Sequence, residues 1–409
     1  MSYVIPSEIH SSSLLAPIAQ DISSVHSPLA VYVHIPFCAK HCAYCDFNTY
    51  VVKSQGTAVL ETVDAICGDI ECTASEDATL RRRPVRSIFF GGGTPTFLSG
   101  EQLARILRTI RARFNILPDA EISSEANPGS SDAAKFAAMR EAGFNRLSIG
   151  VQSFDDTLLA ALDRFHTADE AASALSAARS AGFDNLNLDL MFALPKQTNA
   201  LWEASLQRAL DLGTEHLSLY ALTLEPGTRF ERLDAGGKLD LPDEDDELRM
   251  YERSIEILTH AGYEHYEVSN FALPGFRSRH NQVYWRNEEY IGFGPGAVSY
   301  IGGRRWKRER LPQKYCSKVA ANADLSVESE RLAAVGQLGE TMMLGLRLRD
   351  GLPMQGIRDR FGIDPHLFFA PQIEKLTREG LLVLECDTLR LTHTGLLLAN
   401  TVLAEFLPD

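Results

Sequence analysis

Positive charge is scarce in this sequence, and it is missing altogether from the first part of the chain. The 409 residues include 40 Lys and Arg but 54 Asp and Glu, which gives a formal net charge of −14 at pH 7. Nucleic-acid-binding surfaces concentrate Lys and Arg, so we expect no nucleic acid among the partners. The first basic residue is Lys40, whereas secretory signals and organellar transit peptides carry basic residues near their start. We therefore expect a cytoplasmic protein.

Long hydrophobic runs are missing too. No window approaches the roughly 18 consecutive apolar residues of a membrane-spanning helix, so the sequence predicts no transmembrane segment. Residues 1–28 contain eight serines and no periodic apolar pattern. This composition predicts a flexible N-terminal tail, and a lid that folds over the active site is the alternative.

The chain has only seven cysteines. Because we expect an intracellular protein, we do not expect them to form a disulfide framework. Three of them, Cys38, Cys42 and Cys45, follow a C-x3-C-x2-C pattern in VYVHIPFCAKHCAYCDF. A random chain of this composition would contain one specified three-cysteine spacing about 0.002 times, so the pattern indicates a ligand set. The other four lack ligand spacing, and we expect them to pack as small apolar side chains; they are Cys67, Cys72, Cys316 and Cys386.

Three thiolates at this spacing suit an iron–sulfur cluster. A complete [4Fe–4S] shell takes four protein ligands, so three thiolates leave one iron free to bind a small molecule. Structural zinc generally takes four ligands, commonly from paired C-x2-C units, and the sequence has no second pair. A zinc site completed by His34 or His41 is the alternative.

Strand-like and helix-like segments alternate in the first two thirds of the chain. The expected strands span residues 30–36, 86–90, 120–125, 146–151, 185–192 and 216–222, and the expected helices span 57–72, 101–114, 131–142, 168–181 and 200–212. This alternation predicts βαβ units and a parallel sheet. Six units are fewer than the eight of a closed barrel. We therefore predict an α/β fold with a partial (β/α)6 barrel over residues 29–302.

The rest of the chain reads differently. Residues 303–330 are polar and without pattern, which predicts a crossing segment. Their basic run 304–308 is expected to be a solvated face, and a contact to the carboxylates of a ligand or to an acidic partner is the alternative. Three helical stretches, a hairpin-like pair and a last helix predict a small winged-helix-like domain over residues 331–409. Acidic residues interrupt its basic ones, so we favour structural support of the barrel over DNA binding.

The cysteine loop resembles the signature of the radical S-adenosylmethionine (SAM) superfamily. Together with GGGTPT at residues 91–96, it makes the chain similar to the coproporphyrinogen III oxidase-like branch from about residue 30 to the end. The resemblance implies a [4Fe–4S] cluster on the three cysteines whose open iron binds the amino and carboxylate groups of SAM. It also implies that, if SAM is cleaved, an external donor reduces the cluster and the cluster passes the electron to SAM. This cleavage would yield a 5′-deoxyadenosyl radical.

Several further positions match that branch one by one. The resemblance implies that Arg164 pairs with the SAM carboxylate, where a bidentate fork suits the group, and that Glu125 receives the amino group. Gln152 and Asp189 would hold the ribose hydroxyls. Asp189 lies inside the apolar run LNLDLMFAL, and a buried charge there needs a partner. The remaining positions expected to line the SAM pocket are Tyr32, Tyr44, Gly92, Gly93, Thr94, Ala221 and Val298.

Two features separate the oxidase from its relatives, the HemW haem chaperones. The oxidase signature has a fourth cysteine two residues after the third, where this chain has Phe47, as the chaperone family does. The motif HNQVYW resembles the HNxxYW motif of that family, to which haem binding is attributed. The expected haem contacts are His280, Asn281, Tyr284 and Trp285.

The resemblance therefore favours a HemW-like haem chaperone that binds haem and transfers it to acceptor proteins. An oxygen-independent coproporphyrinogen III oxidase is the alternative. Because only the second of these is an enzyme of porphyrin synthesis, the sequence leaves open whether the chain is an enzyme. The sequence does not identify the haem acceptor or decide whether the chain forms a homodimer.

Overall fold

The computed structural model describes residues 28–53, 56–130 and 132–407. The tail predicted over residues 1–28 lies outside this part of the chain, apart from Pro28. Twelve strands of the described chain form one sheet in the order β14-β13-β12-β11-β1-β4-β5-β6-β7-β8-β10-β9. Their bounds are β1 (Leu29–Ile35), β4 (Pro84–Gly92), β5 (Asn115–Ala126), β6 (Arg146–Gln152), β7 (Leu186–Phe192), β8 (His216–Ala221), β9 (Glu264–Glu267), β10 (Asn270–Ala272), β11 (Tyr290–Phe293), β12 (Val298–Ile301), β13 (Arg304–Arg308) and β14 (Ser326–Arg331).

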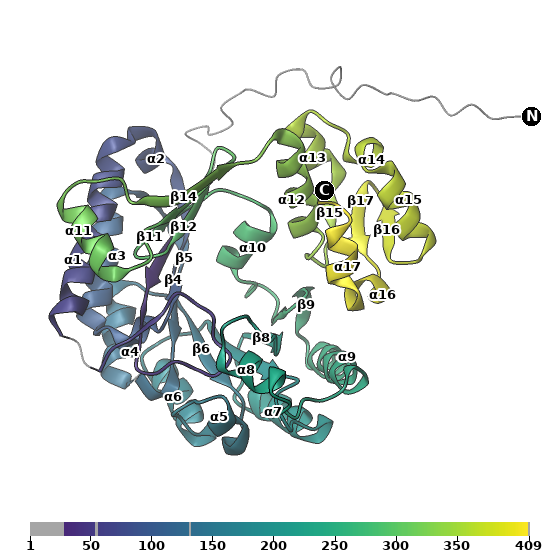
Figure 1. Ribbon diagram of the computed structural model, residues 1–409, viewed down its shortest axis with the longest axis horizontal. Helices are drawn as coiled ribbons and strands as arrows, with labels where there is room; N and C mark the ends of the chain where they lie inside the picture. The colour runs from purple at the N-terminus through teal and green to yellow at the C-terminus, as the bar shows by residue number, and fades with distance from the viewer. Residues whose placement is uncertain (1–27, 54–55, 131, 408–409) are drawn as a thin grey trace, which may run out of the picture.

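The centre of this sheet is parallel. All the neighbours from β11 through β1, β4, β5, β6 and β7 to β8 pair in parallel. Helices connect the strands on the outer face, as Figure 1 shows. They are α1 (Thr57–Glu76), α2 (Ala78–Arg82), α3 (Gly100–Arg113), α4 (Ala133–Ala142), α5 (Asp156–Ala161), α6 (Ala168–Ser180) and α7 (Asn199–Asp211), followed by α8 (Arg229–Ala235) and α9 (Glu244–His260). The predicted partial barrel is confirmed.

Local sequence signals explain where these helices begin. Ser99 starts α3 with a capping box in which Gln102 is the reciprocal partner, and Thr167 and Glu170 do the same for α6. Each box satisfies two backbone N–H groups that the first helical turn leaves free. The strands are buried on both faces, which is why they read as apolar runs. No helix of the described residues is long and apolar enough to cross a membrane.

The expected crossing segment over residues 303–330 is instead regular and belongs to the sheet. It contains β13, α11 (Pro312–Ala320) and most of β14. Arg308 of β13 pairs with the buried Asp69 of α1 at 2.9 Å, and Tyr315 of α11 donates a hydrogen bond of 2.6 Å to the same carboxylate. The basic run is therefore not a free solvated face. Arg305, for example, pairs with Glu330 and Glu340.

The C-terminal segment forms its own hydrophobic core. It contains α12 (Ala334–Gly345), β15 (Leu352–Pro353), α13 (Met354–Phe361), α14 (Pro365–Phe368), α15 (Ala370–Arg378), β16 (Leu382–Glu385), β17 (Thr388–Leu391), α16 (His393–Leu397) and α17 (Ala399–Ala404). The predicted last helix is broken in two. The three strands form a small sheet in the order β15-β17-β16. Asn287, which precedes β11 of the barrel, donates a buried hydrogen bond of 3.0 Å to Thr341 of α12. The separate core supports the proposed division near residue 331.

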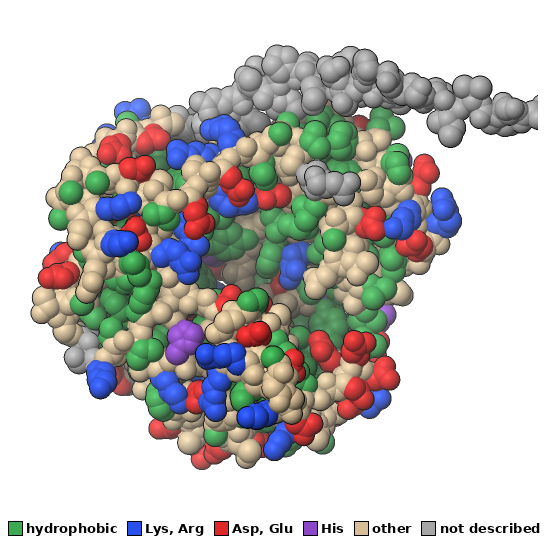
Figure 2. Space-filling model, in the orientation of Figure 1, with side chains coloured by type: hydrophobic (Ala, Val, Ile, Leu, Met, Phe, Trp, Pro, Cys, Tyr) green, Lys and Arg blue, Asp and Glu red, His purple; other side chains and the backbone are tan. Residues whose placement is uncertain are grey.

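One helix lies on the inner side of the sheet. This is α10 (Arg279–Trp285), which Figure 1 places inside the arc of strands and near α12. On the face drawn in Figure 2 the centre of the molecule is hollowed and bordered by hydrophobic side chains, and acidic and basic side chains are interspersed elsewhere.

Candidate functional site

A cavity of about 620 Å³ lies inside the barrel. Its lining comes from the cysteine loop, from strands β1, β4, β5, β6, β7 and β8, and from α10. This volume is typical of a small-molecule site, and the carboxyl ends of parallel strands are where barrel active sites form. Most of the residues predicted for the SAM site lie here. They are Tyr32, Tyr44, Gly92, Gly93, Thr94, Glu125, Gln152, Arg164, Asp189 and Ala221.

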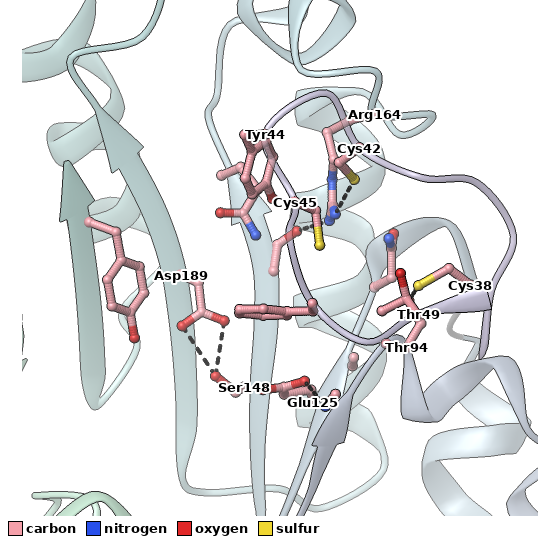
Figure 3. A pocket seen from close by; sticks show the side chains of 18 of the residues that line it. Cys38, Cys42, Tyr44, Cys45, Thr49, Thr94, Glu125, Ser148, Arg164 and Asp189 are labelled. Carbon is pink, nitrogen blue, oxygen red and sulfur yellow. Dashed lines mark hydrogen bonds between the residues drawn. The ribbon is translucent and has the colours of Figure 1, made fainter. Parts of the chain in front are cut away.

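The three predicted cluster ligands border the same cavity. Figure 3 shows Cys38, Cys42 and Cys45 around a space that Glu125 and Asp189 also border. Two short strands, β2 (Phe37–Cys38) and β3 (Tyr50–Val51), pair in parallel and brace the base of the cysteine loop. Burial raises the pKa of the Cys38 thiol, and it raises that of Cys45 to about 12. Metal binding at neutral pH must therefore displace thiol protons.

The alternative zinc site finds little support in its candidate histidine ligand His34. Across the described residues, no three His, Cys, Asp or Glu side chains converge closely enough to hold a single metal ion. His34, one candidate for completing a zinc shell, has both ring nitrogens in hydrogen bonds, to the Tyr32 hydroxyl at 2.9 Å and to the Asn48 carbonyl at 3.0 Å.

A glycine lets strand β4 pass close to the cysteine loop. A Cβ atom on Gly93 would lie 2.7 Å from the Phe37 carbonyl oxygen and 3.1 Å from the Cys38 sulfur. The backbone N–H of Gly93 donates to the Ile35 carbonyl at 2.8 Å, and that of Thr94 donates to Phe37 at 2.8 Å. A larger residue at position 93 would therefore push the cysteine loop away from the strand.

Arg164 follows α5 and points into the cavity beside the cysteine loop (Figure 3). Its Nη1 is 3.6 Å from the Cys42 sulfur, and its Nη2 donates to the Gly150 carbonyl. Its Nε is buried and has no hydrogen-bond partner. A guanidinium donor that is buried without a partner normally costs free energy, so Arg164 fits an anionic ligand group in the cavity.

Two half-buried carboxyl groups face the same space. Glu125 accepts a hydrogen bond of 3.1 Å from the Gly92 N–H, and Asp189 accepts from Ser148 at 3.1 Å and from Asn187 at 2.8 Å. Burial, and secondly the charge of Asp189, raises the pKa of Glu125 to about 8. Burial also raises the pKa of Asp189.

Neither Glu125 nor Asp189 forms an ion pair with a Lys, Arg or His of the described chain. Buried carboxylates need a compensating charge. The ammonium and sulfonium groups of SAM carry positive charge, so the cavity suits this ligand. Gln152 adds a further sign of a functional position, because its backbone has a φ of 67°, in the left-handed region that non-glycine residues rarely adopt.

The predicted haem contacts on α10 divide between two places. His280, Asn281 and Tyr284 line the cavity, whereas Trp285 does not and instead packs against Arg347, whose guanidinium carbon lies 4.4 Å from the ring centroid. Val298, predicted for the SAM pocket, also lies outside the cavity lining, in strand β12.

Both ring nitrogens of His280 are already in hydrogen bonds. Nδ1 is 3.0 Å from the Ser87 hydroxyl, and Nε2 is 3.0 Å from the Tyr284 hydroxyl. The ring also stacks on Phe89 at 5.1 Å. Burial, followed by the charges of Arg86 and Arg146, lowers the pKa of His280 to about 3. The imidazole is therefore neutral, and it could bind iron only after one of these hydrogen bonds broke.

Sequence reasoning missed the polar ladder that supports Asp189. Ser148, Asn187 and Ser218 lie on the neighbouring strands β6, β7 and β8, and Asn187 contacts the hydroxyls of Ser148 at 2.6 Å and Ser218 at 3.1 Å. The available signal was a polar residue inside each apolar run: RLSIGV, NLNLDL and HLSLYAL. Alternation along adjacent parallel strands places such residues on the same inner face.

Comparison with protein families identifies both parts of the chain. Residues 32–209 match the model of the radical SAM superfamily, and residues 336–398 match the model of the HemN C-terminal domain. The solved structure of coproporphyrinogen III oxidase (HemN) from Escherichia coli has a TM-score of 0.81 and 27% sequence identity, covering 94% of this chain and 91% of that chain.

Curated relatives resemble the chain over nearly its full length. The heme chaperone HemW of Bacillus subtilis is 38% identical, over 93% of this chain and 99% of that protein. HemW of Escherichia coli is 36% identical, again over 93% and 99%. A mouse protein called radical S-adenosyl methionine domain-containing protein 1, mitochondrial, is 35% identical over 94% of this chain and 89% of its own length.

Proposed function

The chain belongs to the HemW family of radical SAM proteins, and from this premise we propose that it binds haem and passes it to an acceptor protein in the cytoplasm. We also propose that it holds a [4Fe–4S] cluster on Cys38, Cys42 and Cys45, with SAM in the adjacent cavity. The family supports both parts, and the geometry of the cavity supports the second directly.

The residues of the cavity divide the binding of SAM between them. The cluster, once reduced by an external donor, would supply the electron for any cleavage of SAM. Arg164 offers its unused guanidinium donor to the carboxylate of SAM, and Glu125 offers a carboxylate to the ammonium. Asp189 and Gln152 face the same cavity and would hold the ribose hydroxyls. Binding SAM would compensate the buried carboxylates and close the cavity to water.

One observation carries the choice of chaperone over oxidase. Phe47 stands where the oxidase signature has its fourth cysteine; the residue lines the cavity and is 62% exposed. A phenyl ring offers no thiol for ligation or for hydrogen-atom transfer. The oxidase remains the second candidate, because the HemN structure superposes over nearly the whole chain.

The test compares the two activities on one sample. Protein reconstituted with iron and sulfide under anaerobic conditions is incubated with coproporphyrinogen III, SAM and a reductant, with the Escherichia coli HemN enzyme as positive control. We expect no protoporphyrinogen from this chain and binding of about one haem per chain. Formation of protoporphyrinogen at a rate near that of the control would establish the oxidase instead.

A further inference from the structure

We propose that His41 is the axial ligand of the haem iron, at a porphyrin site on the rim of the SAM cavity. The site consists of His41, Lys40 and the exposed aromatic rings of Phe47, Phe165 and Tyr220. This inference rests on the proposed haem-binding function and gives that function a location.

Exposed aromatic rings mark the rim. Phe47, Phe165 and Tyr220 all line the cavity, yet these residues are 62%, 68% and 40% exposed. Large apolar side chains that stay exposed along one cavity indicate a binding surface. Aromatic rings bury well against a flat conjugated ligand because stacking adds to the area that they remove from water. A porphyrin has two such faces.

His41 provides the metal-binding group. It lies between Lys40 and Cys42, is exposed and lines the cavity, and no partner contacts its ring within the described residues. The other histidine of the lining, His280, has both nitrogens in hydrogen bonds. A neutral imidazole nitrogen is a common axial ligand of haem iron. Between the two histidines, His41 can therefore bind iron without breaking an existing interaction.

Positive charge lies next to the aromatic rim. The Lys40 ammonium is 4.7 Å from the centroid of the Phe165 ring and 2.9 Å from Asp163, whose other oxygen pairs with Arg229 at 2.5 Å. Two cations thus share one carboxylate beside Phe165. Both cations are solvent-accessible, so one can turn to a porphyrin propionate while the other keeps Asp163 paired.

This placement suits transfer. With His41 on one face of the haem, the opposite iron position is open to a ligand of the acceptor. The exchange then forms a bond from iron to the acceptor's ligand and breaks the bond from iron to the His41 nitrogen, with no change in oxidation state. A fully buried ligand such as His280 would instead need α10 to move before the haem could leave.

The test uses the full chain with its cluster reconstituted, and haem as the probe. Resonance Raman spectra of the ferrous haem complex report an iron–imidazole stretching band when histidine is the axial ligand. In His41→Ala we expect this band to disappear and the haem affinity to fall about tenfold or more, with both restored by added imidazole. His366→Ala removes an exposed histidine of the C-terminal domain and should match the wild type.

A second variant separates the aromatic rim from the ligand. Phe165→Ser lies outside the cysteine loop, and we expect it to weaken haem binding severalfold while the iron–imidazole band remains.

An unchanged band and affinity in His41→Ala would overturn the proposal, and loss of the band in His280→Ala alone would assign the ligand to α10. If the wild type binds no haem at all, the proposed chaperone function fails first. Iron and sulfide contents, measured on each sample, show whether a variant kept its cluster.

Discussion

Replacing Glu125 by glutamine should stabilise protein that lacks cluster and SAM, while weakening its binding of SAM. The Glu125 carboxyl lies inside the cavity, and its pKa is raised from 4.5 to about 8 by burial and by the charge of Asp189. Between these pH values the folded protein holds a proton that the unfolded chain releases. Its free energy of unfolding therefore falls as the pH rises through this window and levels off above pH 8.

The magnitude follows from the proton affinities. Each tenfold change in proton affinity corresponds to about 1.4 kcal/mol. Glu125 thus costs the folded protein about 5 kcal/mol above pH 8, about 3 kcal/mol at pH 7 and about 1 kcal/mol at pH 5. Glutamine keeps an oxygen that can accept from the Gly92 N–H, so the substitution removes the titration without removing the hydrogen bond.

Thermal unfolding measures this cost. For a chain of this size, about 5 kcal/mol corresponds to a rise in Tm of about 6 °C. We expect Glu125→Gln to show this rise at pH 8.5, and we expect the rise to shrink to about 1 °C at pH 5. Glu141→Gln, an exposed position on α4, is the matched control and should leave Tm unchanged at both pH values. A variant no more stable than the wild type at pH 8.5 would refute the argument from burial.

The same substitution should weaken SAM binding. Loss of a charge-assisted contact to the ammonium corresponds to about 1.5–3 kcal/mol, or about ten- to a hundredfold in Kd. Equilibrium dialysis with cluster-loaded protein measures it. Opposite signs for stability and affinity would show that the carboxylate is retained for ligand binding at a cost to the fold.

Three further predictions concern the loop, the arginine and the sheet edge. Arg164→Lys should lose the guanidinium fork and bind SAM about tenfold more weakly, with unchanged iron content, in the same dialysis experiment. Gly93→Ala should lower the iron and sulfide bound on reconstitution, because its Cβ would meet the Phe37 carbonyl at 2.7 Å; normal loading would contradict that close approach. Arg308→Met should destabilise the barrel by about 3–5 kcal/mol, because Asp69 would stay buried without its ion-pair partner. Asp69→Asn together with Arg308→Met should recover part of the lost Tm, and a double variant no better than the single one would speak against this pair.

Sequence patterns predicted the parts of this molecule that depend on local periodicity or on fixed spacing. The alternation of apolar strands and amphipathic helices gave β1, β4, β5, β6, β7 and β8 and the helices α1, α3, α4, α6 and α7, because each of these parallel strands is buried on both faces. Strands β4 and β5 extend beyond their predicted bounds, and the short elements β2, β3, α2 and α5 were not predicted. The three cysteines could be recognised as a ligand set because thiolates that bind one cluster recur at short spacing. Their position in the cavity follows from the end of β1.

Interactions between distant residues could not be predicted in this way. Strands β13 and β14 read as a patternless polar segment because their side chains are paired across strands and only partly buried. The burial of Arg308 depends on Asp69 in α1, which no local pattern reveals. In the same way, the HNQVYW motif shows neither that Ser87 and Tyr284 occupy both nitrogens of His280 nor that Trp285 packs beneath Arg347.

The most direct measurement is EPR spectroscopy of the dithionite-reduced protein, before and after SAM is added, on a sample with known iron, sulfide and zinc contents. We predict about four irons and four sulfides per chain, a reduced-cluster signal that changes when SAM binds, and loss of both in a Cys42→Ala variant. Zinc in place of iron, or a cluster signal that SAM leaves unchanged, would contradict a cluster with one iron open to SAM.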